Sequence, residues 1–137
     1  MRSLQKHAAD KFKGTMMEAI GMEVVEVSPE RMVLRLPVTD KVRQPAGLLH
    51  GGATAALVET AASMGSAIQC PDGTMPVGIE INCNHLRGKR DGYVEATAVP
   101  VHRGRKSHVW DVKVLDEKGE LTAVGRCTLM IVPLQSP

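Results

Sequence analysis

The amino-acid sequence predicts an α+β fold in which a curved antiparallel sheet wraps around one long helix. Residues 50–68 favour a helix and carry a single charge, two strand patterns precede this stretch, and four longer ones follow it. Strands that flank one apolar helix on both sides in the sequence indicate a layer of sheet packed on that helix. With 137 residues and 43% hydrophobic content, the chain suits one domain, residues 1–137.

The central stretch determines the rest of the interpretation. It contains six alanines together with larger apolar residues, so it favours helix and carries small or apolar side chains on every face. We therefore expect a helix that is buried all round. Its one charge, Glu59, is costly to bury without a partner, by several kcal/mol. Glu59 is thus either part of a structural ion pair or held in a pocket for chemistry, and the spacing favours chemistry.

The start of this helix carries a second signal. Gly51 and Gly52 add no bulk where the first helical N–H groups are unpaired, so a ligand oxygen could approach these donors and the positive end of the helix dipole. Such a site could clamp a carbonyl or an oxyanion. The alternative is that the glycines only relieve crowding and that His50 is a capping or packing residue.

The segment before the helix predicts a lid or flank, a hairpin and a loop. Apolar residues recur every four positions over residues 4–20 and Gly21 follows, which indicates an amphipathic helix with a C-terminal stop. Residues 22–27 and 31–38 alternate as two strands joined by a short turn. Residues 39–49 then form a loop that leads into the central helix.

Four strands are expected after the helix, within a core of residues 21–132. They cover 75–87, 93–101, 107–115 and 121–132, and short turns rich in Gly, Asp, Lys and Arg separate them. We expect an antiparallel meander. In such a meander, the basic residues that follow strand 75–87 and those that follow strand 93–101 would lie at the same edge of the sheet.

Composition excludes several classes of function. A net charge of +2 and 2% aromatic residues give no general reason for nucleic-acid binding and no stacking platform. Three widely spaced cysteines predict reduced thiols in a cytoplasmic protein and neither a disulfide frame nor a zinc site. We expect no metal, no cofactor, no signal peptide and no membrane span. Cys83 and His85 lie two apart on one strand face, and we interpret them as a buried core pair.

Three runs of residues resemble the hotdog-fold acyl-CoA thioesterases. They are Gln44-Pro-x-Gly-Leu-Leu-His50-Gly-Gly with Glu59 nine residues after His50, then Gly78-Ile-Glu-Ile-Asn-x-Asn-His85-Leu-Arg87, and His102-Arg-Gly-Arg. The resemblance spans residues 21–132. It is strongest to the branch with Glu on the central helix, which contains 4-hydroxybenzoyl-CoA thioesterases and 1,4-dihydroxy-2-naphthoyl-CoA hydrolases. It implies the hotdog fold.

The resemblance also implies roles for individual residues. Glu59 would be nucleophile or general base, the Gly51 N–H would donate to the thioester carbonyl, Gln44 and His50 would orient, and Ser63 would lie near the attacking water. A further set matches positions that bind the acyl or CoA portions: Gly78, His85, Leu86, Arg87, Gly88, His102, Arg103, Gly104, Arg105, Lys106 and Ser107. Arg and Lys at turns suit the CoA phosphates, although any one of them could be ordinary solubilising charge.

We therefore expect a cytoplasmic thioesterase that converts an aryl- or medium-chain acyl-CoA, with 1,4-dihydroxy-2-naphthoyl-CoA as a candidate substrate, to free acid and CoA. A carboxylate and an N–H donor are what thioester hydrolysis needs. The alternatives are a non-catalytic acyl-CoA-binding module and an acyl-CoA dehydratase or hydratase. Flexible apolar residues are candidates to line the acyl pocket: Met16, Met17, Leu48, Met64 and Met75.

Helix geometry predicts a shared site. Gly51 and Glu59 are eight residues apart, so on one helix they lie about 12 Å apart, too far to act on the same carbon. Two copies with antiparallel central helices would bring the Gly51 end of one to Glu59 of the other. We expect a homodimer with two shared sites, assembled further as a dimer of dimers.

Overall fold

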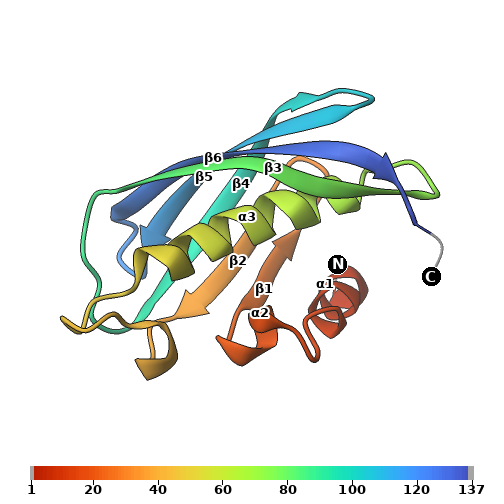
Figure 1. The fold of residues 1–137 in the computed structure, drawn as a ribbon. Coiled ribbons are helices and arrows are strands. Elements are labelled where there is room, and N and C mark those ends of the chain that lie inside the picture. Colours follow the sequence, from red (N-terminus) through yellow and green to blue (C-terminus); the bar gives the residue numbers. More distant parts are fainter. Residues whose placement is uncertain (1, 136–137) are drawn as a thin grey trace.

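The computed structural model describes residues 2–135 and contains one six-stranded antiparallel sheet that curves around a long helix, as predicted. The strands occur in the order β1-β2-β4-β5-β6-β3 across the sheet (Figure 1). Their bounds are β1 Glu23–Val27, β2 Met32–Pro37, β3 Thr74–His85, β4 Tyr93–Arg103, β5 Ser107–Asp116 and β6 Leu121–Pro133. Helix α3, Gly51–Ala67, lies across the concave face of this sheet.

Helix α3 meets the sheet most closely near its C-terminal end. A Cβ on Gly65 would lie 2.6 Å from the Trp110 ring, so only glycine allows the helix backbone to approach the fully buried indole. Leu57, Val58, Ala61 and Ala62 are also fully buried. The expectation of burial on every face was wrong, because one face of the helix is only half-buried. That face carries Ala56, Glu59, Thr60, Ser63 and Met64.

Strand order is the main departure from the sequence prediction. Strands β4, β5 and β6 form a meander, but β3 pairs with β6 at the far edge of the sheet and not with β4. The chain between β3 and β4, residues 86–92, crosses three inter-strand spacings, about 14 Å in total. Seven residues can span this distance. Side-chain alternation identifies strands but carries no information about which strands pair.

The N-terminal segment is two helices and not one. Helix α1 is Arg2–Asp10 and helix α2 is Met16–Ala19, with Gly14 between them in the left-handed region at φ 71°. Gly14 ends the predicted helix because a continuous helix requires negative φ at every residue. Gly21, at φ 81°, stops α2 as expected.

The other elements follow the prediction more closely. Strands β1 and β2 form the expected hairpin. The predicted loop before α3 contains a short 3-10 helix, η1 Asp40–Val42. None of the helices within residues 2–135 is both long enough and apolar enough to cross a membrane.

Candidate active site

The Glu59 carboxylate lies against the backbone of the edge strand β3. A Cβ on Gly78 would lie 2.3 Å from Glu59 Oε1, so the missing side chain of Gly78 makes the room that the carboxylate occupies. Gly78 also lies at a β-bulge, where the register between β3 and β6 shifts and Ile79 is the extra residue. The sequence motif identified Gly78 as a substrate-binding position. The structure places it in contact with Glu59.

Glu59 lines a mainly apolar cavity of about 520 Å³ between α2, α3 and the start of β3. The four methionines that were expected to line an acyl pocket all line this cavity. Leu48, the fifth residue expected there, lines a different cavity. Ser63, one turn after Glu59, is also in the lining. The full lining is Met16, Met17, Ala56, Glu59, Thr60, Ser63, Met64, Ala67, Met75 and Pro76.

No structural ion pair accounts for Glu59. Within residues 2–135, its carboxylate has neither a hydrogen-bond donor nor a cationic partner. Its charge nevertheless acts on the interior. The pKa of the Cys127 thiol is raised to about 12, first by burial and then by the negative charge of Glu59. A half-buried carboxylate without a partner, at the wall of an apolar cavity, is the arrangement expected of a reactive group.

The second half of the site is at the start of α3. His50 is the N-cap, and its Nδ1 accepts a hydrogen bond of 2.8 Å from the Gly52 N–H. The capping interpretation of His50 is therefore correct, and the neutral ring carries its proton on Nε2. Within residues 2–135 the Gly51 N–H has no acceptor, as expected for the first N–H of a helix.

A cavity of about 300 Å³ opens beside the Gly51 N–H. Gln44 borders it, and the Gln44 Oε1 accepts from the Ala46 N–H, which leaves the Gln44 amide NH₂ group free to donate. His85 packs against the start of the helix, since a Cβ on Gly51 would lie 3.0 Å from His85 Nε2. The lining is Gln44, Leu48, Leu49, Gly51, Thr54, His85, Leu86, Arg87, Gly88, Lys89, Thr122 and Ala123.

The pairing of Cys83 with His85 in the core was wrong. His85 is exposed and Cys83 is half-buried, because the C-terminal half of β3 runs along the open edge of the sheet. No group of three or more His, Cys, Asp or Glu side chains within residues 2–135 is arranged to hold a metal ion.

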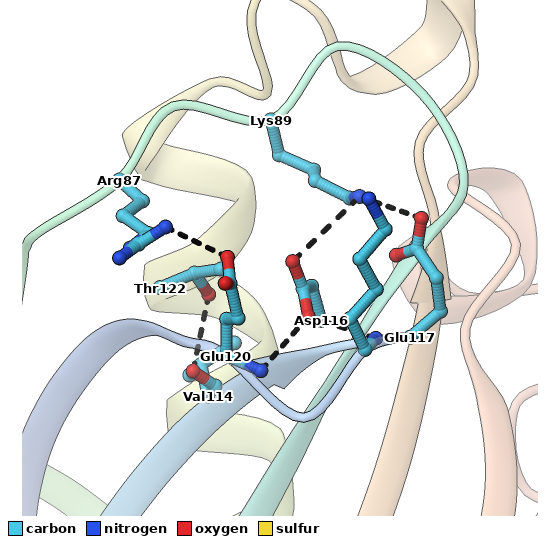
Figure 2. Close-up of polar contacts among 8 residues, drawn as sticks. Arg87, Lys89, Val114, Asp116, Glu117, Glu120 and Thr122 are labelled. Carbon is cyan, nitrogen blue, oxygen red and sulfur yellow. Dashed lines mark hydrogen bonds and ion pairs between the residues drawn. The ribbon is translucent and has the colours of Figure 1, made fainter.

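The basic residues after β3 are paired with acidic residues of the β5–β6 turn. Figure 2 shows Lys89 pointing to Asp116 and Glu117, and Arg87 pointing to Glu120. The Lys89 Nζ lies 2.7 Å from Glu117 Oε1 and 4.0 Å from Asp116 Oδ2. Two cations therefore face three carboxylates of the same chain.

The second basic group lies at the opposite end of α3, so the expectation that both groups share one edge was wrong. Three antiparallel pairings separate β3 from β4, so the two strands run in opposite directions and their C-terminal ends face opposite ends of the sheet. Arg103 donates to the Pro29 carbonyl and to the Gln69 side chain, just beyond the helix C-terminus. Arg105 and Lys106 form no ion pair within residues 2–135. A cavity of about 450 Å³ lies beside Arg103 and Arg105.

A buried polar cluster that the sequence did not reveal lies next to the β4–β5 turn. Ser66 Oγ accepts from Trp110 Nε1 at 2.7 Å and lies 3.0 Å from His108 Nδ1. His108 faces Arg103 across the β4–β5 ladder, beside the turn formed by Gly104 and Ser107. Burial lowers the pKa of His108 below its usual value, and the backbone of Gly104 opposes this effect by hydrogen bonding. In the turn itself, a Cβ on Gly104 would lie 2.6 Å from His102 Nε2.

Comparison with known proteins places the chain in a family. The model of the thioesterase superfamily matches residues 46–123. A 1,4-dihydroxy-2-naphthoyl-CoA hydrolase of Listeria monocytogenes is 43% identical over 85% of this chain and 94% of its own. The proofreading thioesterase EntH of Cronobacter turicensis is 36% identical over 87% of both chains.

Solved structures agree with the sequence matches. A mutant thioesterase from Pseudomonas aeruginosa superposes with a TM-score of 0.92 at 34% identity, over 95% of this chain and 94% of that chain. The fold matches that of a solved thioesterase, and the matched residues 46–123 include the half-buried carboxylate of α3. The chain is a thioester hydrolase of the hotdog fold and belongs to the thioesterase superfamily.

Proposed function

We propose that the chain hydrolyses an aryl- or medium-chain acyl-CoA thioester to the free acid and CoA, with Glu59 as the reactive carboxylate. The observation that carries this proposal is the Glu59 carboxylate, which has no partner in the described part of the chain and lies against Gly78 at the wall of an apolar cavity of about 520 Å³. The acyl group would occupy this cavity. The relative from Listeria monocytogenes, a 1,4-dihydroxy-2-naphthoyl-CoA hydrolase, makes the naphthoyl thioester the first substrate to test.

The chemistry requires a nucleophile at the carbonyl carbon and a donor at the carbonyl oxygen. Glu59 either attacks the thioester itself, forming a mixed anhydride that water then hydrolyses, or deprotonates the attacking water. In both cases the carbon–sulfur bond breaks, the acyl group takes the oxygen of the water and leaves as the acid, and the CoA thiolate takes a proton from the same water. The Gly51 N–H would stabilise the negative charge that develops on the oxygen, at the positive end of the α3 dipole. His50 and the free amide of Gln44 would orient the thioester. Ser63 would hydrogen bond to the water. The reaction would need no metal and no separate cofactor.

Two copies of the chain are needed to build one such site, because Gly51 and Glu59 are about 12 Å apart along α3. Strand β3 supplies a surface for this assembly. It is a twelve-residue edge strand with large exposed apolar side chains, and an open edge of this kind favours pairing with another strand. Pairing of two β3 edges about a two-fold axis would set the two α3 helices antiparallel. Each site would then combine Glu59 of one subunit with Gln44, His50 and Gly51 of the other.

The CoA phosphates would bind at the β4–β5 turn. Arg105 and Lys106 are cations without ion-pair partners in the described chain, and Arg105 lies with Arg103 beside a cavity of about 450 Å³. Phosphates suit exposed basic residues at such a turn. His102, Gly104 and Ser107 would shape the turn. At the other end of α3, His85, Leu86, Arg87 and Gly88 would contact the pantetheine arm of CoA at the cavity beside Gly51.

A panel of acyl-CoA thioesters, assayed by release of free CoA thiol with and without EDTA, tests the proposal. We expect turnover of aryl thioesters that EDTA does not change. Glu59→Gln, nearly isosteric but unable to attack or to accept a proton, should lower kcat by about a hundredfold or more with CoA binding retained. Near-normal kcat in Glu59→Gln would make the carboxylate structural. Binding of acyl-CoA with no thiol release from any substrate would favour a binding module.

Mixed dimers test the shared site. Glu59→Gln would be unfolded and refolded with an equal amount of Gln44→Ala. In a mixed dimer one site receives both defects and the other site receives none. Random pairing should therefore restore about a quarter of wild-type activity. If mixed dimers form but the mixture stays as inactive as its parents, the whole site lies within one chain.

A further inference from the structure

The segment that carries the proposed carbonyl donor has little secondary structure of its own. Residues 43–50 are held in place by residues 86–92, the chain between β3 and β4. The Leu49 N–H donates to the Lys89 carbonyl at 2.7 Å, and Arg43 Nε donates to the Arg90 carbonyl at 2.9 Å. A Cβ on Gly88 would lie 3.0 Å from Leu48 Cδ2, so the two segments are also packed closely. The position of Gly51 therefore depends on the position of residues 86–92.

Lys89 in turn fixes residues 86–92 on the rest of the fold. Its side chain is 13% exposed and lies between the carboxylates of Glu117 and Asp116, as Figure 2 shows. Asp116 is itself held by N–H groups of the turn, since its Oδ1 accepts from Lys118 and Glu120 at 2.9 Å each. Lys89 is thus bound to two carboxylates on the rigid β5–β6 turn.

Glu117 is also confined. Its Oε1 lies 2.5 Å from the position that a Cβ on Gly92 would take, so the carboxylate rests on the bare backbone of Gly92. The hydrogen bond to Glu117 raises the pKa of Lys89, and the same contact lowers the pKa of Glu117. The contact therefore remains charged over the whole neutral range. Arg87 and Glu120 differ, because both are about half exposed and their pair contributes little.

We propose that Lys89 is a positioning residue, which holds residues 86–92 on the β5–β6 turn and thereby sets the Gly51 N–H for the thioester carbonyl. The inference rests on the proposed function, because it assigns a task to the Gly51 N–H. It gives Lys89 no direct contact with CoA phosphate, since two carboxylates already surround its ammonium group. It also gives a task to Asp116 and Glu117, whose sequence alone indicates ordinary surface charge: they hold Lys89 in place.

Kinetics of Lys89→Met with two substrates provide the first test. Loss of the ammonium group should let residues 43–50 shift, and a shift approaching 1 Å lowers the rate by about ten- to a hundredfold. We expect kcat to fall by this factor, and to the same extent for acyl-CoA and for the acyl-pantetheine that lacks the nucleotide. Any rise in KM should also be equal for the two substrates, because both carry the pantetheine arm that Leu86, Arg87 and Gly88 would contact. Lys89→Arg, which keeps the charge and can reach both carboxylates, should restore most of kcat. Arg126→Met removes an exposed ion pair of the same 2.7 Å length and should leave kcat unchanged.

Amide hydrogen exchange provides a readout that does not depend on activity. The Leu49 N–H should exchange at least tenfold faster in Lys89→Met than in wild type, while the amides of central β5 keep their protection. If Lys89→Met does not fold, Glu117→Gln replaces it, because it weakens the same contact without removing Lys89. A wild type inactive on every thioester would refute the proposed function, and the exchange result would still report on the contact.

Two results would overturn the inference. One is a rise in KM for acyl-CoA alone with kcat unchanged, which would make Lys89 a phosphate ligand. The other is an unchanged Leu49 exchange rate in the folded variant, which would show that the ion pairs do not hold the segment.

Discussion

Gly78→Ala is the substitution whose effect the structure specifies most closely. Gly78 lies beside the β-bulge at Ile79 but is absent from the residues with positive φ, so alanine is compatible with its φ. The new methyl group would nevertheless lie 2.3 Å from Glu59 Oε1 and 3.3 Å from Glu59 Cδ. Real atoms do not approach so closely. Because the obstacle is the end of a flexible side chain and not backbone, the carboxylate will move and the strand will stay.

The required movement sets the magnitude. Restoring an ordinary contact of about 3.4 Å moves the carboxylate oxygen by about 1 Å. A misplacement of 1 Å in a reacting group costs about a hundredfold in rate. We therefore expect kcat to fall by about this factor. The free energy of unfolding should change by about 1 kcal/mol or less, because no cavity forms and no buried hydrogen bond is lost.

The assay compares kcat and melting temperature in Gly78→Ala and in a control, Gly21→Ala. Gly21 has φ 81° with no atom within 4 Å of its would-be Cβ, so alanine there strains the backbone after α2, outside the β5–β6 turn and the residues assigned to the site. The strain costs about 1–2 kcal/mol, so the control should lose stability and keep kcat. The two variants should thus show opposite effects. If Gly78→Ala has normal kcat, either Glu59 is not the reactive carboxylate or its position against β3 does not matter.

Three further predictions concern other parts of the molecule. Arg103→Ala combined with Arg105→Ala should raise KM for acyl-CoA and leave kcat nearly unchanged, and the effect should vanish with acyl-pantetheine; an equal rise for both substrates would exclude a phosphate site. Because burial lowers the pKa of His108, the unfolded chain takes up this proton first as the pH falls below about 6.5, so stability decreases there. The melting temperature of His108→Gln should fall less between pH 7.5 and 5.5 than that of wild type, and parallel curves would contradict this. With its pKa at about 12, Cys127 is about one part in 10,000 thiolate at pH 8, so a thiol reagent should label it only on unfolding, and rapid labelling of the folded protein would contradict its burial.

The sequence predicted those features that depend on local pattern. The run of alanines with one carboxylate indicated both the helix and an unusual Glu59, and the structure shows that carboxylate without an ionic partner in the described chain. The glycines before the helix predicted an exposed N–H donor, and Gly51 has no acceptor there. The strands were likewise found, because alternation and turn residues are local signals.

Contacts between residues far apart in the chain could not be predicted from the sequence. Pairing of β3 with β6 depends on the path of residues 86–92 across the end of the sheet, which no periodicity encodes. The wrong placement of the two basic groups has a different cause, because consecutive strands of any antiparallel meander end at opposite ends of the sheet. Similarly, the resemblance predicted that Gly78 binds the acyl or CoA portion, but only the fold shows its contact with Glu59, 19 positions away in the chain.

The ion pairs of Lys89 were hidden for a related reason. Asp116 and Glu117 belong to a turn rich in charge, and such turns are usually solvated. Only the fold brings them to Lys89, at a separation of 27 and 28 positions, and leaves the side chain of Lys89 only 13% exposed. The sequence did contain one signal, Gly92, whose missing side chain makes the room that Glu117 occupies. This glycine can be interpreted only when the structure shows that Glu117 lies beside it.

Two groups of α3, the Gly51 N–H and the Glu59 carboxylate, together argue for a symmetric partner. Among residues 2–135, the N–H at one end of the helix has no acceptor and the carboxylate at its middle has no donor or cation, and the two lie about 12 Å apart on a rigid element. Bringing them together within one chain would require unwinding two turns of a helix whose inner face is fully buried. A two-fold axis beside the helix requires no such change. It places each carboxylate opposite the N–H of the other copy, so a thioester bound between them meets both groups, and one interface creates two sites.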